Sequence, residues 1–182
     1  MHKKSNIYPK NKTTENIILE LFFKKPSERF NIREVARKLK IAPSTVSIAT
    51  RGLINKRFLL REQLGKSIYL SANLENMEFI FEKMMYNIKK IKYSNLIDFL
   101  VKNYKPEAIV IYGSYSRGED IENSDIDIAV ITPLKKHLDL RNFTEFLARS
   151  VHILEINNLN KISKELTINI INGFVIYGKL RL

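Results

Sequence analysis

Two aspartates stand two residues apart at the start of a strand-like segment, Asp125-Ile-Asp-Ile-Ala-Val-Ile-Thr132. Side chains alternate along a strand, so Asp125 and Asp127 are expected to point to the same face. Aspartate is depleted in strands, and neighbouring carboxylates repel each other unless a cation or solvent separates them. The pair therefore predicts either a divalent-metal site or a solvated sheet edge.

A glycine and a serine, Gly113 and Ser114, end the preceding apolar strand, which is predicted over residues 107–112. Glycine lets the backbone approach a ligand closely, and free N–H groups after it can bind an anion. A Gly-Ser turn is common, so it is informative only together with the aspartate pair. Combined, the two features predict a nucleotide site in which amides and a hydroxyl hold phosphates while carboxylates hold metal.

This combination resembles the signature of the nucleotidyltransferase superfamily, which is Gly-Ser followed by a spacer and Asp-x-Asp. Ten residues separate Ser114 from Asp125, and the spacing is similar to that of minimal nucleotidyltransferase (MNT) domains with the DNA polymerase β-like fold. Arg117 and Ser124 also match, and the resemblance covers about residues 105–182. The resemblance assigns Asp125 and Asp127 to Mg²⁺ or Mn²⁺, and Gly113, Ser114, Arg117 and Ser124 to a nucleoside triphosphate, with ATP as donor substrate.

The signature is broken at one position. The superfamily normally supplies a third carboxylate from the next strand, predicted here over residues 150–156, but His152 stands in that place. Glu155 does not replace it, because three residues along a strand is an odd step that turns the side chain to the other face. Three interpretations stay open: His152 is a general base, a ligand of a softer metal such as Mn²⁺ or Zn²⁺, or a sign that the site binds nucleotide without turnover.

The basic residues of the chain are unevenly distributed. The formal net charge is +12, and residues 1–72 hold 16 Lys and Arg against 5 Asp and Glu, whereas residues 73–182 hold 15 against 14. Such an N-terminal excess is the electrostatic footprint of nucleic-acid binding, or else a lysine-rich solvated surface. There is no cysteine, so disulfides and thiolate metal sites are excluded.

No apolar run reaches the length of a membrane helix. The basic N-terminal segment also lacks the apolar core of a signal peptide. We therefore expect a cytoplasmic protein with no membrane partner, which also suits the absence of cysteine.

The N-terminal part shows helical periodicity followed by two strand-like runs around Gly65. The predicted elements are a helix capped by Thr13 or Thr14 and running to about Lys24, helices over 32–39 and about 43–56, and strands over 58–62 and 67–71. A short turn joins the second and third helices, as in a helix-turn-helix. The whole pattern resembles the winged helix-turn-helix domains of small prokaryotic regulators.

That resemblance implies that the third helix enters the major groove of double-stranded DNA and that the hairpin, or wing, flanks it. Arg51 is suited to read a guanine edge. The residues expected to contact DNA are Ser44, Thr45, Ser47 and Arg51 on the helix, and Arg57, Arg61 and Lys66 around the hairpin. The alternative is a winged helix used for protein contact or dimerisation.

The sequence predicts an α+β chain of three parts. Residues 1–72 form the winged helix-turn-helix domain, residues 73–104 a helical connector, and residues 105–182 a small mixed β-sheet of the nucleotidyltransferase fold. The connector is either a dimer helix that spaces two winged helices or a linker packed on its own domains. The C-terminal part is expected to contain helices over 138–148 and 158–171.

The resemblance implies two alternative functions. MNT proteins commonly act as antitoxins that adenylylate a tyrosine of a HEPN-type toxin protein. The leading hypothesis is therefore a homodimeric DNA-binding enzyme that transfers AMP from ATP to a hydroxyl of such a partner. The alternative, favoured by His152, is a winged-helix transcriptional regulator whose nucleotidyltransferase domain is catalytically degraded and serves as a nucleotide sensor or partner platform.

Overall fold

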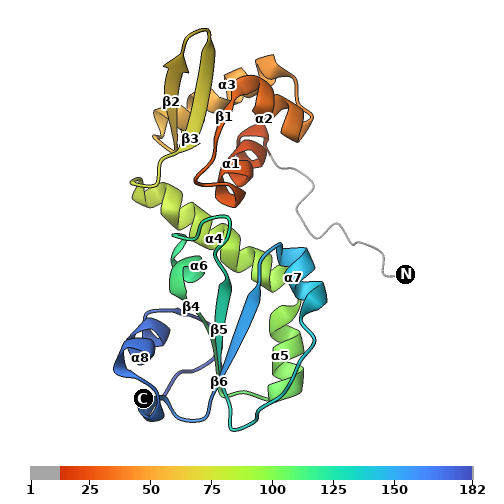
Figure 1. Ribbon diagram of the computed structural model, residues 1–182, viewed down its shortest axis with the longest axis vertical. Helices are drawn as coiled ribbons and strands as arrows, with labels where there is room; N and C mark the ends of the chain where they lie inside the picture. The colour runs from red at the N-terminus through yellow and green to blue at the C-terminus, as the bar shows by residue number, and fades with distance from the viewer. Residues whose placement is uncertain (1–12, 182) are drawn as a thin grey trace, which may run out of the picture. The chain divides into compact units, whose positions relative to one another are not determined.

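The computed structural model describes residues 13–181 and shows a mixed α+β chain, as expected (Figure 1). The N-terminal segment 1–12 lies outside the described residues, as does Leu182. The chain divides into two compact units between Ile80 and Phe81, within the stretch predicted as a connector. None of the helices found between residues 13 and 181 has the length and apolar character needed to cross a membrane.

The first unit contains three helices and a three-stranded antiparallel sheet of order β1-β3-β2. Its elements are α1 (Thr14–Lys24), β1 (Arg29–Asn31), α2 (Ile32–Leu39), α3 (Pro43–Asn55), β2 (Leu59–Leu64) and β3 (Ser67–Ala72). Strand β1 was not predicted, because three residues are too few to show alternation. Helix α2 begins where expected, since Asn31 and Glu34 form a reciprocal capping box.

The second unit is built around a four-stranded mixed sheet of order β6-β5-β4-β7, in which β5 and β6 are parallel and the other pairs antiparallel. Its elements are α4 (Met77–Tyr93, which begins in the first unit), α5 (Leu96–Tyr104), β4 (Ala108–Tyr112), α6 (Gly113–Arg117), β5 (Ile126–Ile131), α7 (Arg141–Leu147), β6 (Val151–Ile156), the 3₁₀ helix η1 (Leu159–Lys161), α8 (Lys164–Ile171) and β7 (Phe174–Gly178).

Helices cover both faces of this sheet, with α5 and α8 on opposite sides (Figure 1). On the α5 side the buried core includes Ile88, Ile91, Leu96, Leu100, Ile109, Ile111, Ile126, Ile128 and Val130. On the α8 side it includes Ala108, Val110, Ala129, Ile131, Ile156 and Ile170. Because Ile88 and Ile91 of α4 lie in this core, they are not available to a second copy of the chain.

Two helix predictions differ from the structure. The helix predicted over 138–148 begins only at Arg141, because the Asp139 side chain accepts a hydrogen bond from the Arg141 backbone N–H (3.1 Å). The helix predicted over 158–171 is divided into η1 and α8, because Ser163 caps a new helix through the Leu166 N–H (3.3 Å). In both cases a local hydrogen bond to a polar side chain outweighs apolar periodicity.

Candidate functional site

The ends of three strands bring the predicted chemical groups together at one edge of the second unit's sheet. Asp127 of β5 pairs in register with Tyr112 of β4 and with His152 of β6. Asp125 lies just before β5, and its Oδ2 is 3.4 Å from His152 Nε2. Gly113 follows Tyr112 directly. The structure therefore places Gly113, both aspartates and His152 in one cluster.

Gly113 is required by both its conformation and its position. Its φ is +73°, which is in the left-handed region that favours glycine. A Cβ at this position would lie 2.9 Å from Asp127 Oδ2, closer than such contacts allow. The backbone can therefore approach the Asp127 carboxylate only because residue 113 has no side chain.

Gly113→Ala is expected to reduce the affinity for ATP with Mg²⁺, the ligands that the sequence predicts, at least tenfold. The new methyl group displaces the Asp127 carboxylate, and the positive φ adds a strain of about 1–2 kcal/mol. Gly65→Ala is the matched control, because Gly65 has a φ of +58° but nothing within 4 Å of the added Cβ. Thermal unfolding of both variants measures the backbone strain that they share, and calorimetric titration of ATP measures the effect of the contact with Asp127, which only Gly113→Ala has. Equal ATP affinity in the two variants would contradict the assignment.

The Asp127 carboxylate is half-buried beside another carboxylate. Burial raises the pKa of Asp127, the charge of Asp125 raises it further, and His152 opposes the shift. Burial and the nearby Asp127 also raise the pKa of Tyr112. Sequence analysis missed Tyr112, because only the pairing register places its ring beside Asp127.

The donor set fits a hard divalent cation. Asp125 and Asp127 offer carboxylate oxygens, and their mutual repulsion is relieved when a cation binds between them. Within residues 13–181, no three His, Cys, Asp or Glu side chains are grouped so as to hold a metal ion by themselves. Mg²⁺ characteristically takes one or two carboxylates and completes its shell with waters and substrate phosphates. The pair is therefore suited to a metal that is shared with a nucleotide.

Of the remaining predicted nucleotide-binding residues, Ser114 and Arg117 lie in helix α6 and Ser124 lies just before Asp125. Ser114 is the second residue of the helix, and the Ser114 carbonyl accepts a bond from the Glu119 N–H (3.0 Å). Arg117 Nε donates to Glu119 Oε2 (2.8 Å), so its guanidinium is already engaged locally. Ser124 Oγ accepts from the Ile121 N–H (2.9 Å). Of the predicted set, Gly113 is the residue placed directly against an aspartate.

Glu155 takes no part in this cluster. Its Oε1 accepts hydrogen bonds from the Tyr104 hydroxyl (2.5 Å) and from the Lys136 N–H (2.8 Å). It thereby holds the segment after β5, at the opposite end of β6 from His152. The third strand accordingly presents an imidazole, and no carboxylate, beside Asp127.

In the first unit, all seven residues predicted to contact DNA are exposed. They are Ser44, Thr45, Ser47 and Arg51 on α3, Arg57 in the turn that follows it, Arg61 on β2, and Lys66 in the β2–β3 turn. A groove of about 470 Å³ between α3 and the hairpin is lined by Ser47, Arg51 and Arg61 together. These three side chains thus lie along one concave surface.

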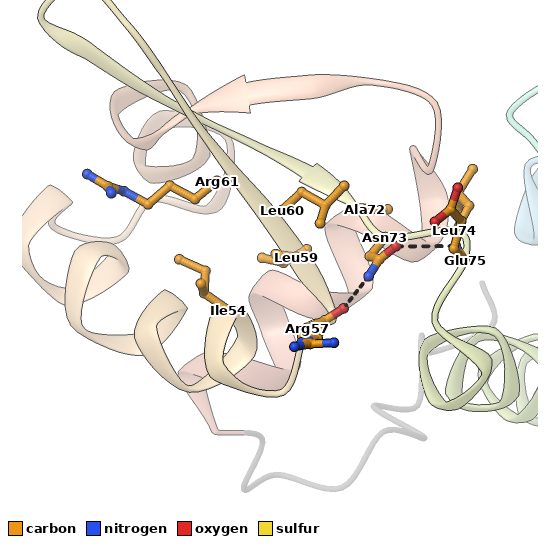
Figure 2. A pocket seen from close by; sticks show the side chains of 9 residues that line it. All are labelled: Ile54, Arg57, Leu59, Leu60, Arg61, Ala72, Asn73, Leu74 and Glu75. Atoms are coloured by element: carbon orange, nitrogen blue, oxygen red, sulfur yellow. Dashed lines mark hydrogen bonds between the residues drawn. The ribbon is translucent and has the colours of Figure 1, made fainter.

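A second hollow, of about 820 Å³, separates Arg57 from Arg61 (Figure 2). Arg57 lies at the end of the turn after α3, where its carbonyl accepts from Asn73 Nδ2 (2.9 Å), whereas Arg61 extends from β2 on the far side of Ile54 in this view. The two arginines therefore do not form a single cationic cluster.

A third hollow, of about 750 Å³, is lined by two arginine side chains that sequence analysis did not predict as DNA contacts. Arg33 and Arg37 of α2 line it together with Lys66 and Pro43. Their spacing of four residues on an amphipathic helix was a usable signal, because the apolar stripe of α2 lies on the other side.

Comparisons with known proteins bear mainly on the second unit. Residues 94–181 match the family described as "Polymerase beta, Nucleotidyltransferase", which is just under half of the chain. A stretch of 31 residues is 61% identical to a protein of Methanocaldococcus jannaschii whose name assigns it provisionally as a protein adenylyltransferase. The stretch is 17% of this chain and 36% of the relative, so the chain spans about a third of that protein's length. These findings support a nucleotidyltransferase-type domain in the C-terminal part.

Solved structures give weaker likenesses. A toxin–antitoxin structure with AMP-PNP is 28% identical over 47% of this chain and 73% of its own, with a TM-score of 0.36. A transcriptional regulator is 18% identical over 48% of this chain and 60% of its own, with a TM-score of 0.33. Similarities at this level carry no argument about fold or activity.

Proposed function

We propose that the second unit is a metal-dependent adenylyltransferase that transfers AMP from ATP to a hydroxyl of a partner protein. The observation that carries the proposal is the cluster of Asp125, Asp127 and His152 at the ends of neighbouring strands, against a glycine whose missing side chain leaves room for the Asp127 carboxylate. The family match over residues 94–181 and the relative named as a protein adenylyltransferase support the reaction class.

The nucleotide is held between the turn at Gly113-Ser114 and the aspartates. Backbone amides of the turn and the Ser114 hydroxyl bind the β- and γ-phosphates. Asp125 and Asp127 would hold Mg²⁺ or Mn²⁺, which when bound neutralises negative charge on the α-phosphate and the pyrophosphate. Arg117 reaches a phosphate only by exchanging Glu119 for it.

In the transfer, the acceptor oxygen forms a bond to the α-phosphorus while the bond to the β-phosphate oxygen breaks and pyrophosphate leaves. His152 takes the hydroxyl proton, because imidazole is the side chain best suited to accept and release a proton near neutral pH. Asp125 Oδ2, 3.4 Å from His152 Nε2, stabilises the imidazolium that results. The exposed position of His152 lets a protein hydroxyl approach it from solvent.

The first unit is proposed as a winged helix that binds double-stranded DNA. The order α2, short turn, α3 and hairpin supports this, as does the groove that gathers Ser47, Arg51 and Arg61. A homodimer would present two such units to a two-fold DNA site. The partner protein that the sequence resemblance implies is a HEPN-type toxin, with a tyrosine hydroxyl as the acceptor.

A second candidate function rests on His152 itself. If this imidazole has replaced an essential carboxylate, the second unit binds nucleotide without turnover, and the chain is a DNA-binding regulator with a nucleotide sensor. Titration of ATP with Mg²⁺, with Mn²⁺ and with neither distinguishes the candidates when His152→Asp is measured beside the native protein.

For the enzyme, we expect the native protein to bind ATP only with metal and to release pyrophosphate when an acceptor is present. His137→Asp is the control, because it adds the same carboxylate at an exposed residue outside the cluster. Binding of ATP by the native protein without release of pyrophosphate, even when an acceptor is present, would favour the nucleotide sensor. Binding by His152→Asp alone would mean that His152 has disarmed the second unit and that the first unit carries the function, and binding by neither protein would refute the nucleotide site.

A further inference from the structure

A buried ionic network lies in the second unit and has no part in the mechanism above. Lys83 of α4 is 0% exposed and Asp120 is 2% exposed. Lys83 Nζ donates to Asp120 Oδ1, Asn87 Nδ2 donates to the same oxygen (2.7 Å), and Arg149 donates to Asp120 Oδ2 (2.9 Å). One carboxylate is thus bound by two cations and an amide.

The same three donors also bind the backbone of α6 and of the segment that joins α6 to β5. Asn87 Nδ2 donates to the carbonyl of Tyr115 (3.0 Å). Lys83 Nζ donates to the carbonyls of Gly118 (3.2 Å) and Asp120 (2.7 Å). Arg149 Nη1 donates to the carbonyls of Ile121 and Ser124, the latter at 3.2 Å. Five carbonyls between residues 115 and 124 are therefore held by three side chains.

Apolar packing does little to hold the part of this segment that leads to the aspartates. Residues 119–125 include one apolar side chain, Ile121, which is 47% exposed. Burial lowers the pKa of Lys83, although Asp120 opposes the shift, so the network is expensive to bury. Buried ion pairs rarely add stability beyond what apolar side chains provide. The hydrogen bonds of this network fix the position of the segment instead.

The segment lies between the two halves of the candidate site. Ser114 stands before it, and Asp125 follows Ser124 directly. Arg149 itself lies three residues before His152, so one guanidinium links the residue preceding Asp125 to the chain entering β6. Displacement of this segment moves Asp125 relative to both Gly113 and His152.

We infer that Asp120 is a positioning residue that acts through Lys83, Asn87 and Arg149 to place Asp125 against the phosphate-binding turn and His152. The inference rests on the proposed function for its effect on catalysis, but its effect on the segment is independent of that function. Asp120 is 2% exposed and is bonded to three side chains, so its carboxylate is not available to a nucleotide or a metal ion.

Arg149→Lys is the most informative variant. It keeps a cation beside Asp120 but loses the planar fork that spans the Ile121 and Ser124 carbonyls. Its side chain is 8% exposed, so a shorter ammonium can still be hydrated and the unit can still fold. Arg141→Lys is the matched control, because Arg141 forms a similar pair with Asp139 at the exposed surface.

We expect Arg149→Lys to raise the half-saturating Mg²⁺ concentration for ATP binding at least tenfold and to lower kcat, with the KM of the acceptor within twofold. Arg141→Lys is expected to leave all three values unchanged. Asp120→Asn, which removes the charge but keeps the shape, is expected to act in the same direction. A Mg²⁺ requirement within twofold of the native value in Arg149→Lys, whatever its melting temperature, would overturn the inference.

Hydrogen exchange separates failure of this inference from failure of the proposed function. The amides of Glu119, Ser124 and Ile126 are bonded to the carbonyls of Ser114, Ile121 and Ser150 respectively. They are expected to exchange at least tenfold faster in Arg149→Lys than in Arg141→Lys. If the native protein binds no ATP, the proposed function fails, but the exchange rates still test whether the buried network holds the segment in place. Unchanged exchange overturns the inference in either case.

Discussion

Asp127→Asn is expected to lower the rate of AMP transfer at least about a thousandfold while slightly raising the stability of the metal-free second unit. The amide cannot replace a carboxylate as a hard metal ligand, so the transition-state charge is left uncompensated. Transfer is measured by following label from the α-phosphate of ATP into the acceptor. Asp125→Asn is expected to show a similar loss. A rate of AMP transfer by Asp127→Asn within tenfold of the native rate would refute the role of Asp127 as a metal ligand.

The stability change follows from the raised pKa of Asp127. Folding raises this pKa, so the folded state binds the proton more tightly, and the ionised native carboxylate opposes folding once the pH exceeds the folded pKa. Asparagine imitates the protonated form and removes that penalty. Because the group is only half-buried, solvent screens the effect, and we expect a rise in melting temperature of about 1–4 °C at pH 7.

The pH dependence provides an internal check. The advantage of Asp127→Asn should be present at pH 7 and vanish below about pH 4, where the native carboxylate is protonated in both states. Asp139→Asn is a control of opposite sign, because hydrogen bonds from Arg141 lower the pKa of Asp139 to about 2. Removal of the Asp139 charge should slightly lower the melting temperature at pH 7, and this difference from the native protein should disappear as the pH falls towards 2. Mg²⁺ with ATP should stabilise the native protein but not Asp127→Asn.

Raising the salt concentration from 50 to 200 mM is expected to weaken binding to double-stranded DNA by about three orders of magnitude for a homodimer. Arg57, Arg61 and Lys66 give three predicted phosphate contacts in each copy, and six contacts correspond to a slope of about −5 in log affinity against log salt. A single copy would show half that slope and a loss of about fortyfold. Fluorescence anisotropy across a salt series measures both slope and stoichiometry.

Substitution of single residues tests which side chains contribute to the salt dependence of DNA binding. Lys66→Ala should reduce the slope by about one for each copy bound, whereas Lys161→Ala, an exposed lysine of the second unit, should leave it unchanged. Arg51→Ala should weaken binding and relax the preference for guanine at one position of the site. An affinity that does not change with salt would exclude DNA binding through these cations.

Local sequence determined much of what the structure contains. Periodicity and caps placed α2 at the bounds observed and α1 to within one residue, with Thr13 and not Thr14 as its cap, because such caps lie within three residues of the N–H groups they bind. Such features depend on neighbouring residues and are therefore readable without a fold.

Tertiary structure alone decided which distant groups meet. The family resemblance had already implied that His152 lies beside Asp127, which the parallel register of β5 and β6 shows, but the antiparallel register of β4 and β5 that puts Tyr112 on the other side of Asp127 had no signal in the sequence. Lys83, Asp120 and Arg149 read singly as surface charges, since such residues are rarely buried unless paired. Their pairing over 29 to 37 positions of sequence separation depends on how α4 and the chain before β6 pack around one loop, and no local pattern encodes it.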